Sequence, residues 1–429
     1  MAFKDFMKSK EPYLSPYEKE NMDSGKNEMT FARAVEKETP LPSAQSFKSE
    51  IPAQEAAASQ ETEPQGHHRA NKRIEEDIIL EPIPSPPSPR KPPKKEAQEM
   101  FEGPLGIDIG TTNIVLAQKE DNHIKISLQL NAFVTMPYSS LTKEALLKNE
   151  IFFFISDHTL YVMGHSAEDF ADIFGGHVRR PIESGILNPK ENEAENVIKA
   201  FIEQLLRPPK KRGEKAYFSV PGKSLDGTGS SLTYHESVLK SHLASLGYAP
   251  VAINEGSAVV ISELSGNNYT GIGISLGGGM CNICFSYLTV PVISYSVPKG
   301  GDYIDTMAAR AAGESQIKVK GIKENELNLL ASPKDRIETA LHVYYGDLFA
   351  ILANSLQNVL GTSASLPRLS KPIPIVLSGG TILPPGSHEM FLKAMKGIRL
   401  PFKISEVLVA KNPLYATAKG ALTMALLEE

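Results

Sequence analysis

The chain has 429 residues, of which 41% are hydrophobic, carries a formal net charge of -5, and contains only two cysteines, Cys281 and Cys284. This length allows two or three domains, while the charge and the cysteine count exclude the basic surface of a nucleic-acid-binding protein and a disulfide framework. No apolar run reaches the roughly 20 residues needed to cross a bilayer, and the N-terminus lacks a signal-peptide core, so we expect a cytoplasmic protein without a nucleic-acid partner.

Residues 1–101 form a tail rich in Glu, Lys, Pro, Ser and Gln. Its apolar residues are too sparse to offset the entropy of ordering, so the tail is predicted to be disordered. Phe3, Phe6 and Met7 have the spacing of a short amphipathic helix that would contact a membrane or a protein partner, although a plain tail explains them equally well. The proline-rich run 81–95 favours a semi-rigid spacer over a ligand for a proline-reading module.

The globular part is expected from about residue 103, and it opens with a strand, a glycine turn and a second strand. Apolar residues alternate over 105–109 and resume over 114–117, which predicts a hairpin. Gly110 allows the turn to bend so that backbone N–H groups converge on an anion, although a plain turn is the alternative. The N–H groups concerned are those of Thr111, Thr112 and Asn113. Asp108 beside them would repel a phosphate unless a divalent cation intervened, so the pattern favours phosphate with Mg²⁺.

Further elements follow between residues 151 and 222. Residues 151–155 and 160–163 are predicted to be paired strands, 194–206 has helical spacing, and 216–222 is typical of a buried strand that ends in a turn. Gly222-Lys223-Ser224 resembles the end of a P-loop, but the glycine that this motif needs five positions earlier is missing, so that motif is rejected.

A second strand and helix pair is predicted around Glu255. The apolar face of 235–246 predicts a helix that ends at Gly247, and 251–253 is a short strand. Glu255 ends that strand and begins a helix whose first residues, 256–258, are small. An acid is favoured at a helix N-terminus by the helix dipole alone, so the position by itself does not decide its role.

The strand, glycine turn and strand pattern recurs over 271–285. Three consecutive glycines occupy the turn, and their entropic cost favours a close backbone approach over a casual turn. They are Gly277, Gly278 and Gly279. Cys281 and Cys284 lie in the second strand, away from the helix N-terminus that a reactive C-x-x-C pair needs, so they are predicted to be buried structural cysteines.

The remaining elements are mostly helical. Gly300 and Gly301 precede Asp302 at a predicted helix start, where the acid could serve as an N-cap, and helical spacing runs through 335–360. Residues 374–384 form a strand that breaks into the turn Gly379-Gly380-Thr381. The segment 412–422 is a predicted helix with a face of small residues.

Taken in order, these segments resemble those of the actin, DnaK-type chaperone and sugar-kinase superfamily, and the resemblance covers essentially all of 103–427. It implies an α/β, two-lobed actin-like ATPase fold with RNase H-like sheets. Lobe I would comprise 102–255 and be completed by the C-terminal helix 412–429, while lobe II would comprise 256–411.

The resemblance also implies a site that holds ATP and Mg²⁺ between the lobes. Glu255 would orient or deprotonate the attacking water, and Asp108 would hold the metal through water. The residues that would bind the nucleotide are Gly110, Thr111, Thr112, Asn113, Gly277, Gly278, Gly279, Gly379, Gly380 and Thr381.

Two departures from the family limit what the resemblance implies. Ser275 stands where the family usually has Asp, and because Ser supplies no carboxylate to the metal or its waters, ATP binding is better supported than hydrolysis. The family's helix that embraces the adenosine is not recognisable within 313–330, which leaves the base specificity open.

Three functions remain in view. An actin-like filament or scaffold with weak ATP hydrolysis, and with self-association, is favoured by 179–187, which is similar to a segment of MreB-type bacterial actins. A nucleotide-gated adaptor is favoured by Ser275 and the tail. A DnaK-type ATPase lobe is favoured by the first glycine turn, but little chain follows residue 422. A sugar kinase is disfavoured because no candidate for its catalytic Asp is found.

Overall fold

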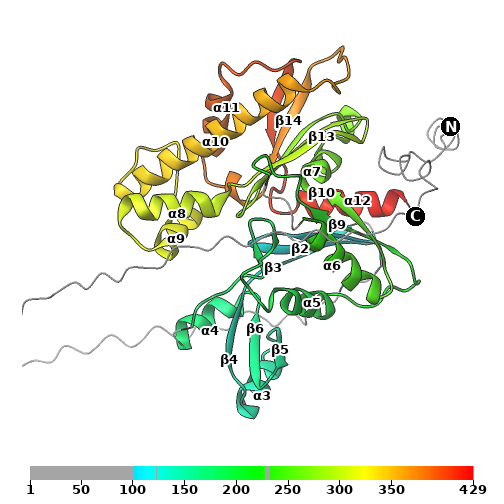
Figure 1. Ribbon diagram of the computed structural model, residues 1–429, viewed down its shortest axis with the longest axis vertical. Helices are drawn as coiled ribbons and strands as arrows, with labels where there is room; N and C mark the ends of the chain where they lie inside the picture. Colours follow the sequence, from blue (N-terminus) through cyan, green and yellow to red (C-terminus); the bar gives the residue numbers. More distant parts are fainter. Residues whose placement is uncertain (1–100, 102, 122, 175, 228–231, 429) are drawn as a thin grey trace, which may run out of the picture. The chain divides into compact units, whose positions relative to one another are not determined.

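The computed structural model describes residues 101–428 except 102, 122, 175 and 228–231 (Figure 1). These residues lie within one compact unit, Pro89–Glu429. The predicted disorder of residues 1–100, the N-terminal amphipathic helix and the proline-rich spacer lie outside the described residues. Phe101, which the sequence analysis assigns to the tail, is instead buried in the core, and its amide donates a 2.9 Å hydrogen bond to the Leu205 carbonyl.

Two five-stranded sheets with the same topology organise the fold (Figure 1). Their orders are β10-β9-β1-β2-β3 and β13-β12-β11-β14-β15. In each sheet, a three-stranded antiparallel meander is followed by two strands that run parallel to the first strand of the meander. This repeated arrangement confirms the predicted α/β fold with two RNase H-like sheets.

The strands of the first sheet are β1 (Leu105–Ile109), β2 (Asn113–Glu120), β3 (His123–Leu130), β9 (Lys215–Val220) and β10 (Ala249–Asn254). The strands of the second sheet are β11 (Gly271–Leu276), β12 (Cys281–Tyr287), β13 (Val290–Val297), β14 (Ile373–Ser378) and β15 (Ile404–Val409). Both predicted glycine hairpins are confirmed, since β1 pairs antiparallel with β2 and β11 with β12. β11 and β14 are buried along their whole length, as expected for central strands covered on both faces.

Two smaller sheets extend the part of the fold that contains the first sheet. They comprise β4 (Phe133–Pro137), β5 (Phe153–Ser156) and β6 (Thr159–Met163) in one, and β7 (Ile182–Glu183) and β8 (Ile186–Leu187) in the other. β5 pairs antiparallel with β6, which confirms the strand pair predicted over 151–163.

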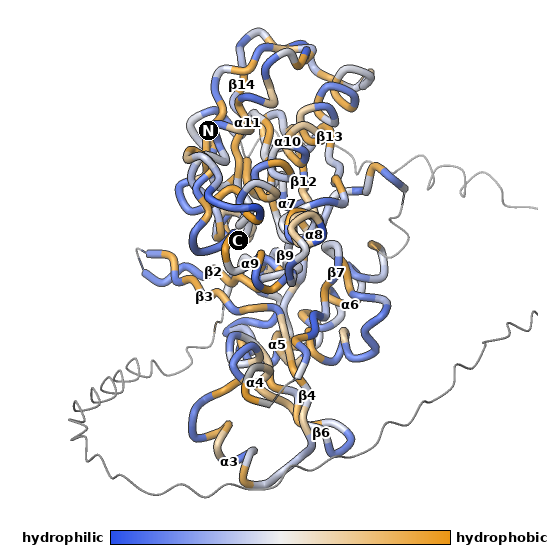
Figure 2. Tube along the Cα trace, turned by 90° about the vertical axis from the view of Figure 1, so that its left-hand side faces the viewer, coloured by the Kyte–Doolittle hydropathy of each residue, from blue (hydrophilic) through white to orange (hydrophobic). Residues whose placement is uncertain are grey.

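The helices surround these sheets (Figure 1). They are α3 (Ser140–Lys148), α4 (Ser166–Phe174), α5 (Ala194–Leu205), α6 (Leu232–Ser245), α7 (Glu255–Glu263), α8 (Gly301–Ala312), α9 (Gln316–Asn325), α10 (Arg336–Thr362), α11 (Ser387–Met395) and α12 (Ala416–Leu427), with short 3-10 turns η2 (Ser265–Asn267) and η3 (Gly380–Ile382). The predicted helices at 194–206, 235–246, 335–360 and 412–422 are confirmed as α5, α6, α10 and α12. Apolar residues run along the strands, and polar ones gather in the connecting loops (Figure 2).

Two separate apolar cores stabilise the fold. One joins the first sheet to α5 and α6, and the other joins the second sheet to α8, α10 and α11. Two helices connect them crosswise, because α7 follows the first sheet but packs on β11 and β12, whereas α12 follows the second sheet but packs on β1 and β9. The lobe boundaries at residues 255 and 411 stay a prediction.

The contact between α7 and α12 depends on small residues. A Cβ added at Gly420 would overlap the backbone carbonyl of Ala258, and one added at Gly106 would overlap the backbone of α12 at Ala418 and Leu422. Glycine is therefore required where the helix backbones approach this closely. Ala258 is one of the small residues that follow Glu255 in the sequence.

The two cysteines are free and buried in β12, as predicted. Burial raises the pKa of the Cys284 thiol to about 11, so it stays protonated and unreactive near neutral pH. Within the described part of the chain, no helix combines the length and the apolar character needed to cross a membrane.

Candidate functional site

A cavity of about 640 Å³ lies between the ends of the central strands of both sheets and is lined by every residue that the sequence analysis assigns to the site. These residues are Asp108, Gly110, Thr111, Thr112, Asn113, Glu255, Gly277, Gly278, Gly279, Gly379, Gly380 and Thr381. Ser275 lines the same cavity. The structure thus brings together residues more than 250 positions apart, although their roles in binding stay a prediction.

The turn between β1 and β2 is held by its own backbone and by contacts from two neighbouring loops. The Gly110 amide donates to the Asn113 carbonyl at 2.9 Å, and the Asn131 side chain donates to the Gly110 carbonyl at 2.8 Å. The Thr111 hydroxyl accepts a 2.9 Å hydrogen bond from the Gly185 amide in the turn between β7 and β8. These bonds fix the loop at the edge of the cavity.

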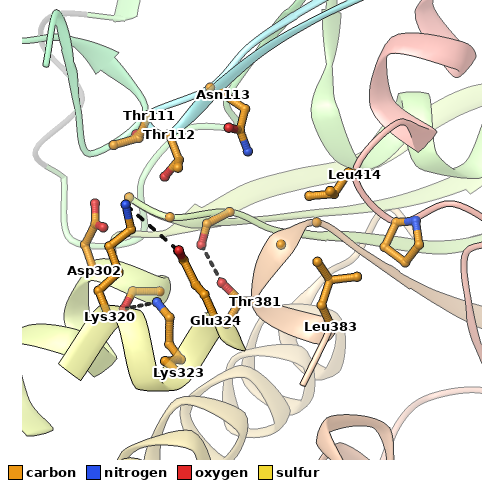
Figure 3. Close-up of a pocket in the computed structure, with 18 of the residues that line it drawn as sticks. Thr111, Thr112, Asn113, Asp302, Lys320, Lys323, Glu324, Thr381, Leu383 and Leu414 are labelled. Atoms are coloured by element: carbon orange, nitrogen blue, oxygen red, sulfur yellow. Dashed lines mark hydrogen bonds and ion pairs between the residues drawn. The ribbon is translucent and has the colours of Figure 1, made fainter. Parts of the chain in front are cut away.

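The turn between β11 and β12 is fixed by α8 and η3. The Gly277 carbonyl accepts hydrogen bonds from the Gly301 amide at 3.0 Å and from the Thr381 hydroxyl at 2.9 Å (Figure 3). The Gly278 carbonyl accepts one from the Asp302 amide at 2.9 Å. The β11–β12 turn is therefore hydrogen-bonded both to the start of α8 and to η3, and these three segments form this side of the cavity.

The two glycine turns approach each other closely. A Cβ at Gly278 would overlap the Thr112 hydroxyl, and one at Gly279 would overlap the Thr111 hydroxyl and lie 2.9 Å from the Ser184 Cα. The consecutive glycines are thus explained by the close backbone approach predicted for them. Backbone and hydroxyl groups of both turns line the cavity beside this contact, and such groups can bind a phosphate.

Two partly buried acids face the cavity beside these turns. Asp108 accepts a 2.7 Å hydrogen bond from the Ser219 hydroxyl, and burial raises its pKa to about 6. Glu255 accepts a 2.9 Å hydrogen bond from the Ser275 hydroxyl, and burial together with the charge of Asp108 raises its pKa to about 8. A helix-terminal acid that only complements the dipole would stay in solvent, so the burial of Glu255 favours a role in the cavity.

A divalent cation fits the chemistry of this end of the cavity. Two neighbouring carboxyl groups make ionisation more costly, as the effect of Asp108 on Glu255 shows, and a cation between them and a phosphate would stabilise the ionised forms. Among the described residues, no group of three or more His, Cys, Asp or Glu side chains could hold a metal alone. A metal here would therefore need ligands from a bound phosphate, with Asp108 as the protein's contribution.

The opposite end of the cavity is more apolar. Gly379 has a positive φ of 94° and its amide donates to the Pro413 carbonyl at 2.9 Å, so the Gly379–Thr381 turn lies flat against the segment before α12. Leu383 and Leu414 extend from these two segments toward each other across the cavity (Figure 3).

The structure also places here a helix that the sequence analysis did not identify. Lys320, Lys323 and Glu324 of α9 line the cavity (Figure 3). Lys323 is buried and donates to Asp305 at 2.7 Å and to the Gly301 carbonyl at 3.3 Å. The i, i+3, i+4 spacing of these three residues is a helical-face signal, but a run of lysines around Gly321 has the composition of a solvated surface helix.

Asp302 has a different role from the predicted N-cap. The N-cap of α8 is Gly300, and Asp302 lies in the first turn of the helix, where its carboxylate pairs with Arg180. This arginine belongs to the 179–187 segment, so that segment contacts the cavity both through Gly185 and through the ion pair.

Comparison with known proteins places these observations in context. A family model described as Volactin matches residues 104–425, and no curated protein sequence matches the chain. A solved structure described as the MamK double helical filament is 17% identical, covers 76% of this chain and 98% of its own, and aligns with a TM-score of 0.58. This likeness shows the fold and confirms the actin-like architecture.

Two further solved structures align less well. A non-polymerising mutant of MamK bound to AMPPNP is 17% identical over 76% of this chain and 98% of its own, with a TM-score of 0.48. The ethanolamine utilization protein EutJ from Carboxydothermus hydrogenoformans is 17% identical over 78% of this chain and 91% of its own, with a TM-score of 0.44.

Proposed function

The chain belongs to the Volactin family, and on that premise we propose that it is an actin-like protein that binds MgATP and assembles into filaments with slow ATP hydrolysis. The observation that carries the nucleotide part is the meeting of two glycine turns beside two partly buried acids in one cavity. The proposal keeps the cytoplasm as its location and the N-terminal segment as the region that contacts a protein partner or a membrane surface.

The phosphates would lie between the turns at Gly110–Asn113 and Gly277–Gly279. Backbone N–H groups and the hydroxyls of Thr111 and Thr112 line this space, and such groups bind phosphate without a side-chain charge. Mg²⁺ would supply the positive charge that offsets the phosphates and Asp108. Glu255 would orient the attacking water.

Hydrolysis would be slow because of the surroundings of Glu255. Ser275 adds a hydrogen bond to Glu255 but no carboxylate for the metal's waters.

The filament part rests on the fold that this chain shares with MamK, whose structure is described as a double helical filament. Sedimentation of the full chain with MgATP, with Mg²⁺ alone and with nucleotide alone tests it directly. Pelleting and filaments in electron micrographs only with MgATP are the expected outcome. A chain that binds MgATP but stays in the supernatant at every concentration would contradict the filament.

The second candidate is an adaptor that binds nucleotide without turnover and without polymerising. Ser275 favours it, because its hydroxyl gives Glu255 a hydrogen bond but leaves the metal's waters without a carboxylate. The same sedimentation experiment separates the two, since an adaptor would gain thermal stability from MgATP but would not pellet.

A further inference from the structure

Tyr345 is a buried tyrosine whose hydroxyl has no hydrogen-bond partner among the residues that the structure describes. The residue belongs to α10, is 0% exposed, and lines the cavity. Leaving a buried hydroxyl unpaired costs stability, so each such group in a folded protein calls for an explanation. A ligand that pairs with it would provide one.

The side of the cavity that Tyr345 lines is the one where a nucleoside would lie. The glycine turns and the acids occupy the phosphate end, and the other end is bounded by α9 and by Leu383 and Leu414 (Figure 3). Lys323 and Thr381 meet beside Gly301, since a Cβ there would lie 3.1 Å from the Lys323 Nζ and 3.1 Å from the Thr381 hydroxyl. A nucleotide with its phosphates between the turns would extend toward α9 and α10.

The charges around Tyr345 determine which kind of group it can pair with. Burial, together with the negative charge of Asp305 and Glu324, raises the pKa of the Tyr345 hydroxyl well above its usual range, so the hydroxyl keeps its proton. The nearby Lys323 ammonium is already bonded to Asp305 and the Gly301 carbonyl. The hydroxyl proton is drawn toward the carboxylates, which leaves the oxygen lone pairs as acceptors for a donor on the ligand.

We propose that Tyr345 selects the base: its hydroxyl oxygen accepts a hydrogen bond from the 6-amino group of adenine, so that the cavity prefers ATP to nucleotides with an oxygen at position 6. A base with a carbonyl there would place an acceptor against the lone pairs of Tyr345. This inference rests on the proposed function, because it assigns the base of the nucleotide in the same cavity.

The test compares the affinities of the full chain for MgATP and MgITP, which differ at position 6 of the base. Wild-type protein is expected to bind ATP about tenfold more tightly than ITP, or better. Tyr345→Phe is expected to weaken ATP binding by about tenfold and to leave the affinity for ITP within about twofold of the wild-type value. The ratio of the two affinities should therefore be close to one in this variant.

Tyr295→Phe provides the matched control. Tyr295 is also buried in the second core, but its hydroxyl is paired with Ser355 at 3.1 Å and it does not line the cavity. Tyr295→Phe should lower the melting temperature and keep the ATP preference. Tyr345→Phe should not lower the melting temperature of the nucleotide-free protein, because it removes an unpaired polar group and keeps the ring.

Two outcomes would overturn the inference: equal binding of ATP and ITP by the wild type, or an ATP preference that survives Tyr345→Phe. Failure of the wild type to bind ATP, ITP or GTP would instead overturn the proposed function, and the two failures are therefore distinguishable.

Discussion

Arg180 contacts Asp302 through two hydrogen bonds, from its Nη1 to Oδ1 at 3.1 Å and to Oδ2 at 3.0 Å. Arg180 lies two residues before β7, whose Ile182 belongs to the core of the first sheet, whereas Asp302 lies in α8, which belongs to the core of the second. A second ion pair, Lys320 with Glu168 at 3.7 Å, joins α9 to α4. Asp302, Lys320 and Glu168 all line the cavity, so both pairs connect its two sides.

Breaking the Arg180–Asp302 pair should speed nucleotide release. The side chains are 26% and 31% exposed, so the pair stabilises the closed cavity by about 1 kcal/mol or less, which corresponds to at most about a fivefold increase in the release rate for Arg180→Ala. Stopped-flow release of a fluorescent ATP analogue measures this rate. The double exchange Arg180→Asp with Asp302→Arg should restore slow release. As a control, Lys190→Ala removes an exposed ion pair with Glu183 and should leave the release rate unchanged.

If raised salt and Arg180→Ala leave the release rate unchanged, the pair does not hold the cavity closed. Salt is expected to speed release in the wild type and to have a smaller effect in Arg180→Ala, because exposed ion pairs are screened.

Two glycines in helices should respond to alanine with opposite signs. At Gly420 in α12, a Cβ would overlap the backbone of Ala258 in α7, so Gly420→Ala should destabilise the protein by about 1–3 kcal/mol or more. At Gly321 in α9, nothing lies within 4 Å of the added Cβ, so Gly321→Ala should stabilise it by about 0.5–1 kcal/mol. Thermal unfolding of the two variants measures both changes in stability. Equal changes in melting temperature would show that glycine is not required for the close approach of α7 and α12.

The parts of the site that sequence could predict are those that local pattern determines. The alternation of apolar residues on either side of Gly110 and of Gly277–Gly279 predicts the two glycine hairpins. It does so because strand periodicity and turn-forming residues are both features of a segment of about ten residues. The order of the loops then supplied the rest through the family resemblance. The two hairpins follow from these local signals, whereas the assignment of the site residues rests on the resemblance.

The parts that sequence could not predict depend on partners far along the chain. Lys323 looks like a solvated lysine until Asp305 is placed beside it, and Asp302 looks like a cap until Arg180 reaches it from the other side of the cavity. Phe101 follows a polar tail and is buried only because α5 ends next to it. In each case, tertiary contacts override the local signal.

The nucleotide-free protein should lose stability as the pH rises from 6.5 to 8.5. The folded-state pKa of Glu255, about 8, lies above its ordinary value of 4.5, so the folded protein holds a proton that the unfolded chain has released. Stability from this group is fully present below the unfolded value and is lost as the pH rises through the folded value. The contribution of Glu255 to the slope of the unfolding free energy against pH cannot exceed that of one proton, about 1.4 kcal/mol per pH unit.

Glu255→Gln should flatten this slope, because the amide imitates the protonated carboxyl. Chemical denaturation at several pH values measures it, and the window lies above the pKa of Asp108, which is about 6. An identical slope in the wild type and in Glu255→Gln would assign the pH dependence to another group.

Asp108→Ala should weaken nucleotide binding far more with Mg²⁺ than without it. The carboxylate lies beside the first glycine turn, so without metal it repels phosphate and with metal it attracts the complex. Titrations with MgATP and with ATP plus a chelator measure the two affinities. Equal losses in both would show that Asp108, held by Ser219, is only structural.

Ser275→Asp should raise the rate of ATP hydrolysis without tightening ATP binding much. Wild-type turnover should be slow, because Ser275 supplies Glu255 with a hydrogen bond but gives the metal's waters no carboxylate. Positioned acid and base groups contribute roughly 10² to 10⁴ in rate, and a restored carboxylate would act mainly on the transition state. Single-turnover phosphate release at saturating MgATP measures the step.

Ser275→Ala should hydrolyse ATP more slowly than the wild type, since Glu255 loses the donor that favours its ionised form. Rapid wild-type turnover that is abolished by Glu255→Ala and unimproved by Ser275→Asp would instead show that the Ser275 hydroxyl, or a water that it holds, already does the work of the missing acid.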